Sequence, residues 1–592
     1  ALRVGADAFA SDLNPVAVLL NKVVLEYIPK YGQQLADEVR KWGNWIKNEA
    51  EKELAEFYPK DPDGATPIAY LWARTIKCEG PGCGAEVPLM RSLWLAKKGD
   101  RSVALRLMPN TKNKCVDFEI IENAKTKDVG EGTVRRGSAT CPVCGFTTPQ
   151  TSVRSQLKQK YGGANNSRLL AVALKKHSEA GVFFRLAESN DTKLLVLAEK
   201  RLTKRFSKSI PRQQIRSKNQ SDVGRMPLYG MANYGSLFTH RQLLTLLTIA
   251  TLIERLDTKL SSGKNAALRL CLACALDKQV DYLSSLSRWH TSGQFVNNTY
   301  GRQALPMIWD FVEACPFSGA SGNYLGAVEW VSRFVEQERK GLVGCGFGQA
   351  ERATATSHPL ADDISDALIT DPPYYDAIGY SNLSEFFYVW LRRSVSDLFP
   401  SLLSAELPDK TAECIVDSTV AQDQSYFLKT MTEALGESRR YGKPTSIGVV
   451  VFAHSSTSAW EAMLDSLNQA GWIVTASWPI DTEMANRMNA MGTAALASSV
   501  HIVCRPRENP DGSLRTNEIG DWRDVLAELP KRIHEWMPRL AEEGVVGADA
   551  IFACLGPALE IFSRYSRVEK ASGVIVPLRE YLEHVWAAVA KE

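Results

Sequence analysis

The chain lacks long apolar runs, and this absence narrows what it can be. No stretch of its 592 residues reaches the ~18 apolar residues of a membrane span, and the apolar run at 16–20 ends at Asn21 and Lys22. No charged and apolar leader with a cleavage site is present, so the sequence predicts neither a membrane segment nor a secretory signal peptide. We therefore expect a cytoplasmic protein.

Cysteine is also scarce, and the charges nearly balance. Twelve cysteines in 592 residues are too few for a disulfide scaffold, and 45% hydrophobic with 23% charged residues is ordinary for a globular protein. The net charge is only +3, so a nucleic-acid surface would have to be a local patch. The length exceeds what one compact core holds, which predicts roughly two to four domains.

The last third of the sequence alternates strand-like with helix-like segments. Short apolar runs rich in branched residues predict strands at 367–370, 446–453, 472–478 and 499–504. Amphipathic segments predict helices at 383–398, 424–440 and 458–469. Residues 6–12 predict another strand, after which Asn14-Pro15 opens a helix. This alternation predicts an α/β fold with a doubly wound, Rossmann-like sheet.

The tetrapeptide Asp371-Pro372-Pro373-Tyr374 directly follows the strand at 367–370, which we expect to be buried. Two prolines fix the backbone and remove two N–H donors, so carbonyl oxygens remain as acceptors beside the Asp371 carboxylate. Such a turn can accept both hydrogens of an exocyclic amine, while Tyr374 offers a flat face to a base. The carboxyl edge of a parallel sheet is where α/β proteins bind ligands. The alternative is a proline turn without a chemical role.

This motif resembles that of the amino-methyltransferases, which use S-adenosylmethionine to methylate N6 of adenine or N4 of cytosine. The segments 235–242, 300–311 and 371–393 resemble more closely the zinc-ribbon-containing adenine-specific DNA methyltransferases. That resemblance implies that Asp371 and the Pro372 carbonyl orient the amine and that Tyr374 stacks on a base flipped out of double-stranded DNA.

The resemblance carries further expectations about the target base and the setting. Tyr375 and Tyr380 would help to hold the flipped base, although aromatic packing under the loop is an equal alternative for both. Related enzymes belong to restriction–modification or phage-defence systems, so partner proteins of such a system are expected. The functional alternatives are a cytosine-N4 or RNA methyltransferase and a non-catalytic DNA-binding subunit.

Asp12 ends the strand predicted at 6–12, and an acidic residue in that place binds ribose hydroxyls in doubly wound folds. By resemblance, Asp12 and Asn14 form the second cofactor motif; the alternative is that one of them caps the next helix. The first cofactor motif, a strand with a glycine-rich loop, would lie just before Asp12. Only the end of its helix, residues 1–5, matches. The alternative, the glycine-rich segment 344–348, lacks a strand and helix before it, so we expect the chain to be incomplete at its N-terminus.

Four cysteines form two close pairs, Cys78-x4-Cys83 and Cys141-x2-Cys144, each followed by glycine. Knuckles of this form direct their thiolates toward one tetrahedral Zn²⁺. Four sulfur ligands leave no open position, so we expect a structural zinc that holds together a sheet too small to be stable alone. The alternative is two unrelated thiol pairs.

Basic residues gather in the middle of the chain. Residues 200–225 contain nine Lys or Arg and one acid, and with the zinc ribbon they are our candidate DNA-contacting surface, whose phosphate contacts would be salt-dependent. A solvated charged loop is the alternative. The candidates are Arg201, Lys204 and Arg205 and, by resemblance alone, Arg302 and Asn298.

Five segments follow from these assignments. We expect the start of the methyltransferase domain at 1–60, a zinc ribbon at 61–150, a basic linker and helical target-recognition insert at 151–345, the catalytic half at 346–510 and a helical region at 511–592. The expected fold is thus a Rossmann-like methyltransferase sheet interrupted by a zinc ribbon and a mostly helical insertion.

Overall fold

A computed structural model describes residues 1–98, 101–176, 179–216, 222–375, 379–417, 422–454, 456–480, 499–509, 511–545 and 548–591. The chain divides into two compact units. The first comprises residues 1–10, 14–351 and 380–409, and the second comprises residues 11–13, 352–379 and 410–592. Both units mix helices with strands, which confirms the α/β class. The described strands form several small sheets, the largest of four strands, and no doubly wound sheet is seen among them.

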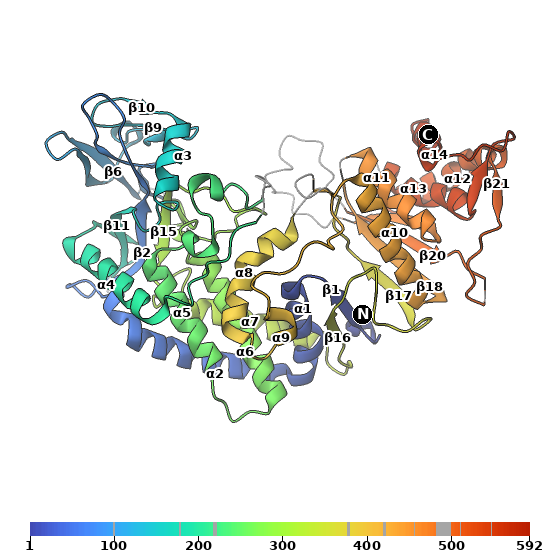
Figure 1. The fold of residues 1–592 in the computed structure, drawn as a ribbon, viewed down its shortest axis with the longest axis horizontal. Coiled ribbons are helices and arrows are strands. Elements are labelled where there is room, and N and C mark those ends of the chain that lie inside the picture. The colour runs from blue at the N-terminus through green and yellow to red at the C-terminus, as the bar shows by residue number, and fades with distance from the viewer. Residues whose placement is uncertain are drawn as a thin grey trace. The chain divides into compact units, whose positions relative to one another are not determined.

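Helices build the core of the first unit. Five of them pack together through apolar side chains (Figure 1): α2 (Ile28–Leu54), α5 (His240–Glu254), α6 (Ser262–Tyr282), α7 (Tyr324–Lys340) and α8 (Tyr380–Val395). Gly43 allows α2 and α7 to approach closely, because a Cβ there would lie 2.4 Å from the Val328 side chain. The shorter helices are α1 (Pro15–Asn21), α3 (Gln150–Gln159), α4 (Ser189–Phe206) and α9 (Pro400–Leu403).

A four-stranded antiparallel sheet accompanies these helices. Its order is β12 (Phe183–Leu186), β11 (Arg168–Lys175), β2 (Thr66–Ala73) and β15 (Asp310–Ala314). Arg241 of α5 and Glu313 of β15 form an ion pair at 2.8 Å, and their side chains are 1% and 0% exposed. The Trp72 indole N–H also donates to Glu313, at 3.1 Å. Both buried charges are therefore paired and hydrogen-bonded, which a buried ion pair requires.

Smaller sheets complete the first unit. They are β3 (Thr75–Lys77) with β4 (Glu86–Pro88), the sheet of β5 (Trp94–Lys98), β6 (Arg101–Asn110) and β7 (Cys115–Glu122), the sheet of β8 (Val134–Arg135), β9 (Ser138–Thr140) and β10 (Thr147–Thr148), and the hairpin of β13 (Arg288–His290) and β14 (Phe295–Asn297). In its described residues, the insert at 151–345 therefore contains five strands, β11 to β15, as well as the expected helices.

The second unit contains a four-stranded sheet in the order β17–β18–β20–β19; Figure 1 labels β17, β18 and β20. β17 (Ser365–Thr370) runs parallel to β18 (Gly442–Phe452), whereas β20 (Ser499–Pro506) is antiparallel to β18 and to β19 (Trp472–Ile480). A parallel pair needs a crossover connection, and α10 (Gln424–Tyr441) lies in it. These four strands, α8, α10 and α11 (Thr457–Gln469) match the segments predicted from the sequence.

Helices pack against this sheet. α10 and α11 contact β18 and β19, while α13 (Ala548–Ser563) lies against β19 and β20. Gly556 brings α13 so close that a Cβ there would lie 2.2 Å from backbone atoms of β19. The unit ends with α12 (Trp522–Glu542), α14 (Leu578–Val589) and the short pair of β21 (Ile519–Asp521) and β22 (Arg567–Glu569).

β17 is not buried, and the expectation that it would be is wrong. Ile369 is 72% exposed, and the side chains of Asp366 and Ala367 are exposed as well. Within the described part of the chain β17 pairs only with β18, so it is an edge strand. An apolar composition predicts a strand that is covered on both faces, but it does not specify which neighbours supply the cover.

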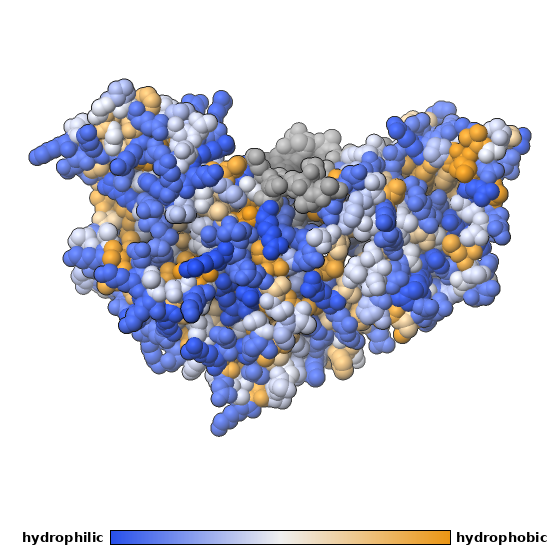
Figure 2. Space-filling view, viewed as in Figure 1, coloured by the Kyte–Doolittle hydropathy of each residue, from blue (hydrophilic) through white to orange (hydrophobic). Residues whose placement is uncertain are grey.

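Among the described residues, no helix combines the length and the apolar character that crossing a membrane requires. On the face drawn in Figure 2, hydrophobic residues lie in small groups among hydrophilic ones.

Candidate functional site

The turn Asp371-Pro372-Pro373-Tyr374 directly follows β17, as predicted. Because Thr370 pairs with Val450 in the parallel register, the turn continues beside the end of β18. Asp371 is exposed, whereas the prolines and Tyr374 are half-buried. No described residue donates a hydrogen bond to the Asp371 carboxylate or to the Pro372 carbonyl. Both acceptors are therefore open to a ligand.

Aromatic side chains support this turn. The Tyr374 ring meets Phe452 edge to face, with 5.5 Å between the centroids. The Tyr375 ring lies 5.1 Å from Phe427 and 5.8 Å from His454. Edge-to-face contacts of this kind orient rings as well as burying them. Tyr375 thus makes the packing contacts that were the alternative to a base-holding role.

The backbone after the motif adopts an uncommon conformation. Tyr375 has a φ of +57°, the left-handed region that bulky residues rarely occupy. Its amide donates to the Pro373 carbonyl at 3.0 Å, and its carbonyl accepts from the Val416 amide at 2.9 Å. Such a conformation costs about 1–3 kcal/mol and persists only where the surroundings fix it, often at functional sites. The turn is therefore held in one shape from both sides.

His454 and Trp460 belong to the same group and were not identified from the sequence. His454 follows β18; its Nδ1 accepts from the Ser456 amide at 3.0 Å, and its carbonyl accepts from the Trp460 indole at 2.9 Å. The Trp460 ring lies 5.0 Å from Phe452, edge to face. A signal was available, because the carboxyl ends of adjacent parallel strands share one sheet edge, where ligands bind.

The proposed second cofactor motif lies at the end of β1 (Phe9–Asp12), which pairs with β16 (Gln349–Arg352). Asp12 is the last residue of the strand, as predicted, and is exposed. Asn14 caps α1, since its side chain accepts from the Val16 amide at 3.0 Å, and it also donates to Ser384 at 2.9 Å. Asn14 therefore has the capping role that was the alternative for it, and Asp12 remains the candidate ribose ligand.

Cys78, Cys83, Cys141 and Cys144 come together, as their spacing predicts. Their sulfur atoms all lie within 4.8 Å of one another, with 3.5 Å between Cys78 and Cys144 and 3.9 Å between Cys83 and Cys141. Zn–S bonds of about 2.3 Å in a tetrahedron place sulfurs about 3.8 Å apart. The four thiols thus fit a structural zinc ion, and within the described ranges no other group of three or more His, Cys, Asp or Glu side chains could hold a metal.

Two β-hairpins carry these thiols. The first knuckle joins β3 to β4, and the second joins β9 to β10. The Gly80 amide donates to the Cys78 sulfur at 3.3 Å, and a Cβ at Gly80 would lie 3.1 Å from the Cys144 sulfur and 2.8 Å from Phe146. Glycine at position 80 therefore permits the close approach of the two knuckles.

The basic DNA-binding candidates lie on α4. Arg201 forms an ion pair with Glu56 at 2.9 Å, and Arg205 forms one with Glu53. Lys204 is exposed. The two pairs reduce the positive charge that α4 presents to a phosphate. Residues 217–221 of the basic segment lie outside the described residues.

Three other candidate residues for binding DNA or the flipped base lie in the first unit. Arg302 is exposed in the loop before β15, and Tyr380 is an exposed residue at the start of α8. Asn298 faces its own loop, where its side chain donates to Asp281 at 2.9 Å and to the Tyr300 carbonyl at 3.1 Å. Arg302 and Tyr380 thus remain accessible, whereas the amide of Asn298 is engaged in holding the loop.

Comparison of the chain with protein-family models, with curated proteins and with solved structures finds no match. A functional assignment therefore rests on the residues and their geometry.

Proposed function

We propose that this chain belongs to an S-adenosylmethionine-dependent DNA methyltransferase that methylates N6 of an adenine flipped out of the duplex. The observation that carries the proposal is the Asp371–Tyr374 turn, which leaves the carboxyl end of β17 with two open acceptors and a supported aromatic ring. This is the place and the chemistry that recognition of an exocyclic amine requires.

The residues of the turn would act by positioning. The Asp371 carboxylate and the Pro372 carbonyl would accept the two hydrogens of the adenine amine, so that the nitrogen lone pair points away from them. Tyr374 would stack on the base. When bound, S-adenosylmethionine supplies an electrophilic methyl group, and no residue has to act as a nucleophile. The catalytic effect of the turn would then come from orientation and electrostatics.

Asp12 would contribute to binding the cofactor. Its exposed carboxylate at the end of β1 fits the hydroxyls of a ribose.

We also propose that the sheet of β17, β18, β20 and β19 is part of a doubly wound methyltransferase sheet, in which a further strand pairs with β17. The support is that β17, which runs parallel to β18, is an edge strand of its sheet within the described residues. The zinc ribbon and the insert would contact DNA.

Methyl transfer by the protein to an adenine-containing duplex, followed by mass spectrometry of the nucleosides, tests the proposal. We expect N6-methyladenine from the wild type and a loss of about 100- to 1,000-fold in rate for Asp371→Ala, the range for removing one preorganised hydrogen-bonding group. The matched control is Asp366→Ala on the same strand, whose exposed carboxylate pairs with Lys443 at 2.6 Å; it should keep its activity.

The other outcomes decide between the alternatives. N4-methylcytosine or methylated RNA would replace the adenine assignment, and DNA binding without methyl transfer would favour a non-catalytic subunit. If Asp371→Ala methylates DNA as fast as the wild type, the assignment of the turn is wrong.

A further inference from the structure

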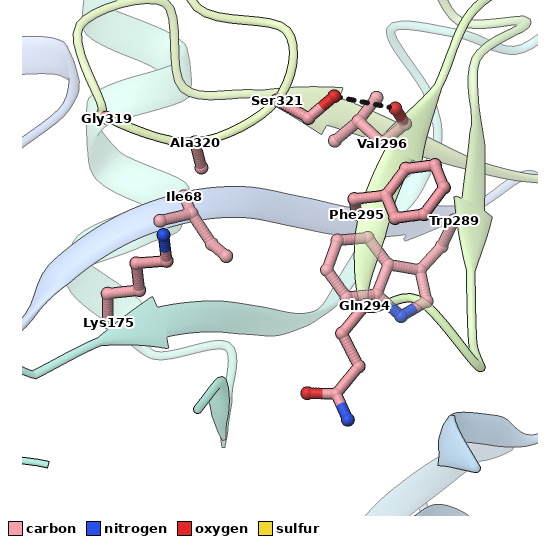
Figure 3. A pocket seen from close by; sticks show the side chains of 9 residues that line it. All are labelled: Ile68, Lys175, Trp289, Gln294, Phe295, Val296, Gly319, Ala320 and Ser321. Atoms are coloured by element: carbon pink, nitrogen blue, oxygen red, sulfur yellow. Dashed lines mark hydrogen bonds between the residues drawn. The ribbon is translucent and has the colours of Figure 1, made fainter. Parts of the chain in front are cut away.

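The first unit contains a cavity of about 190 Å³ that the proposed methyltransferase chemistry does not use. Figure 3 shows Lys175 and Ile68 on one side of it and the rings of Trp289 and Phe295 on the other, with Gln294 at one end. The loop between β15 and α7 closes the cavity with small residues, Gly319 among them. A cationic side chain thus faces two aromatic rings across a small space.

The aromatic wall is held in place by its neighbours. The Trp289 indole donates to the Leu95 carbonyl at 2.7 Å. The Phe295 ring stacks on His290, with 4.6 Å between the centroids and 9° between the planes, and 39% of Phe295 is exposed. Fixed and partly exposed rings of this kind can stack on a nucleic-acid base, because every base has a flat face.

The hairpin turn presents a hydrogen-bonding group at the same place. Gln294 has a φ of +55°, uncommon for a residue other than glycine, and its amide donates to the His290 carbonyl at 2.6 Å. His290 Nδ1 accepts from the Gly293 amide at 2.8 Å, which holds the turn. Gln294 lines the cavity, and its side-chain amide offers both donors and an acceptor, as the edge of a base requires.

Lys175 supplies an unpaired positive charge. It ends β11, its side chain is exposed, and within the described part of the chain its ammonium makes no ion pair or hydrogen bond. This wall of the cavity therefore attracts an anion.

We propose that this cavity binds one unpaired nucleotide, with its base against Trp289 and Phe295 and its phosphate toward Lys175. The volume is below the roughly 300–1,000 Å³ of pockets that enclose drug-sized ligands, so one base fits and a dinucleotide cofactor does not. The nucleotide is a residue of a single strand or a free mononucleotide. The proposal stands independently of methyl transfer at Asp371.

Binding of fluorescein-labelled (dT)12 to the full chain, measured by fluorescence anisotropy, tests the site, and an all-thymine strand contains no target adenine. Phe295→Ala and Trp289→Ala should each weaken binding about 5- to 150-fold, the range for losing one stacked base. Lys175→Gln should reduce the slope of log affinity against log salt by about 0.7. Trp330→Ala on α7, whose indole is 58% exposed outside the cavity, is the matched control and should bind like the wild type.

A second variant guards against a folding defect caused by losing the Trp289 bond. A Cβ at Gly319 meets no atom within 4 Å, so Gly319→Glu should fold, and its carboxylate should repel the phosphate and weaken binding. An abasic strand of equal length should also bind weakly. If thymidine monophosphate competes with (dT)12, the ligand is a free mononucleotide. If it does not compete, the ligand is a residue of a single strand.

Two results would overturn the proposal. They are equal affinity for the abasic strand and (dT)12, and wild-type affinity of Phe295→Ala together with Gly319→Glu. Asp371→Ala should bind (dT)12 normally, which separates this site from the proposed methyl transfer.

Discussion

Replacing Cys83 by serine removes one of the four sulfurs that the two knuckles bring together. We expect the wild-type chain to bind one Zn²⁺ tightly and Cys83→Ser to lose that binding. Serine preserves the size of the side chain but not the thiolate, which is the group that zinc prefers. The change therefore tests the metal and leaves the packing of the hairpins nearly unaltered.

The expected size of the effect follows from the dimensions of the hairpins. β3 has three residues and β10 has two, so backbone pairing contributes little to holding the knuckles together. A backbone hydrogen bond adds a net ~1 kcal/mol, whereas structural zinc contributes about 10–16 kcal/mol in zinc-finger peptides at pH 7. Loss of the metal should therefore unfold the ribbon locally, while the helical core of the first unit stays folded.

Zinc content by mass spectrometry and limited proteolysis are the assays. The wild type should hold one zinc per chain and resist cleavage around the knuckles. Cys83→Ser or chelator treatment should remove the zinc and make both knuckles sensitive to cleavage. Cys115→Ser is the control, because Cys115 starts β7 outside the thiol group. Equal zinc content in Cys83→Ser and the wild type, or no zinc in a wild type refolded with excess zinc, would refute the tetrathiol site.

Three further predictions concern stability. Glu313→Ala leaves the buried guanidinium of Arg241 unpaired and should lower the free energy of unfolding, measured with denaturant, by about 3–5 kcal/mol. The control Glu336→Ala breaks the partly exposed pair with Arg40 and should lower it by about 1 kcal/mol or less. Similar losses for the two variants would contradict the role of burial. Gly556→Ala places a Cβ 2.2 Å from the backbone of β19 and should cost about 1–3 kcal/mol, so an unchanged melting temperature would contradict the close packing. Burial raises the pKa of Asp310 to about 6, so between pH 3.8 and about 6 the folded state holds a proton that the unfolded state has lost. The free energy of unfolding should therefore fall as pH rises through this range. Asp310→Asn should lack this fall, and the same pH profile in the variant and the wild type would contradict the prediction.

Local patterns in the sequence predicted the elements of the second unit well. The strands at 446–453, 472–478 and 499–504 correspond to β18, β19 and β20, because branched apolar runs bounded by turn residues are a local signal. Pairing is not local. The same signal around Ile369 predicted a buried strand, whereas β17 is an edge strand with exposed side chains, since burial depends on which strands and helices pack against it.

The candidate sites also differ in whether they depend on residues that are close together in the sequence. Cysteine spacing predicted the thiol group, because each knuckle is formed by residues a few positions apart. The aromatic support of the Asp371 turn could not be read in this way, since Phe427 lies on α10, Phe452 ends β18 and Trp460 lies on α11. Likewise, the charge of Arg201 indicated a surface position, but its partner Glu56 is 145 residues away in the sequence.

The conformation at Tyr375 bears on the choice between a functional and a merely structural proline turn. A turn that only reverses the chain would be expected to use glycine or asparagine where φ is positive, since these residues adopt it at little cost. Here a tyrosine occupies the position, fixed by Pro373 and Val416, while Asp371, four residues earlier, stays exposed and without a described hydrogen-bond donor. Strain kept beside open acceptors is typical of a binding site. The geometry of the turn therefore supports our proposal that it recognises a ligand that donates two hydrogen bonds, as an exocyclic amine would.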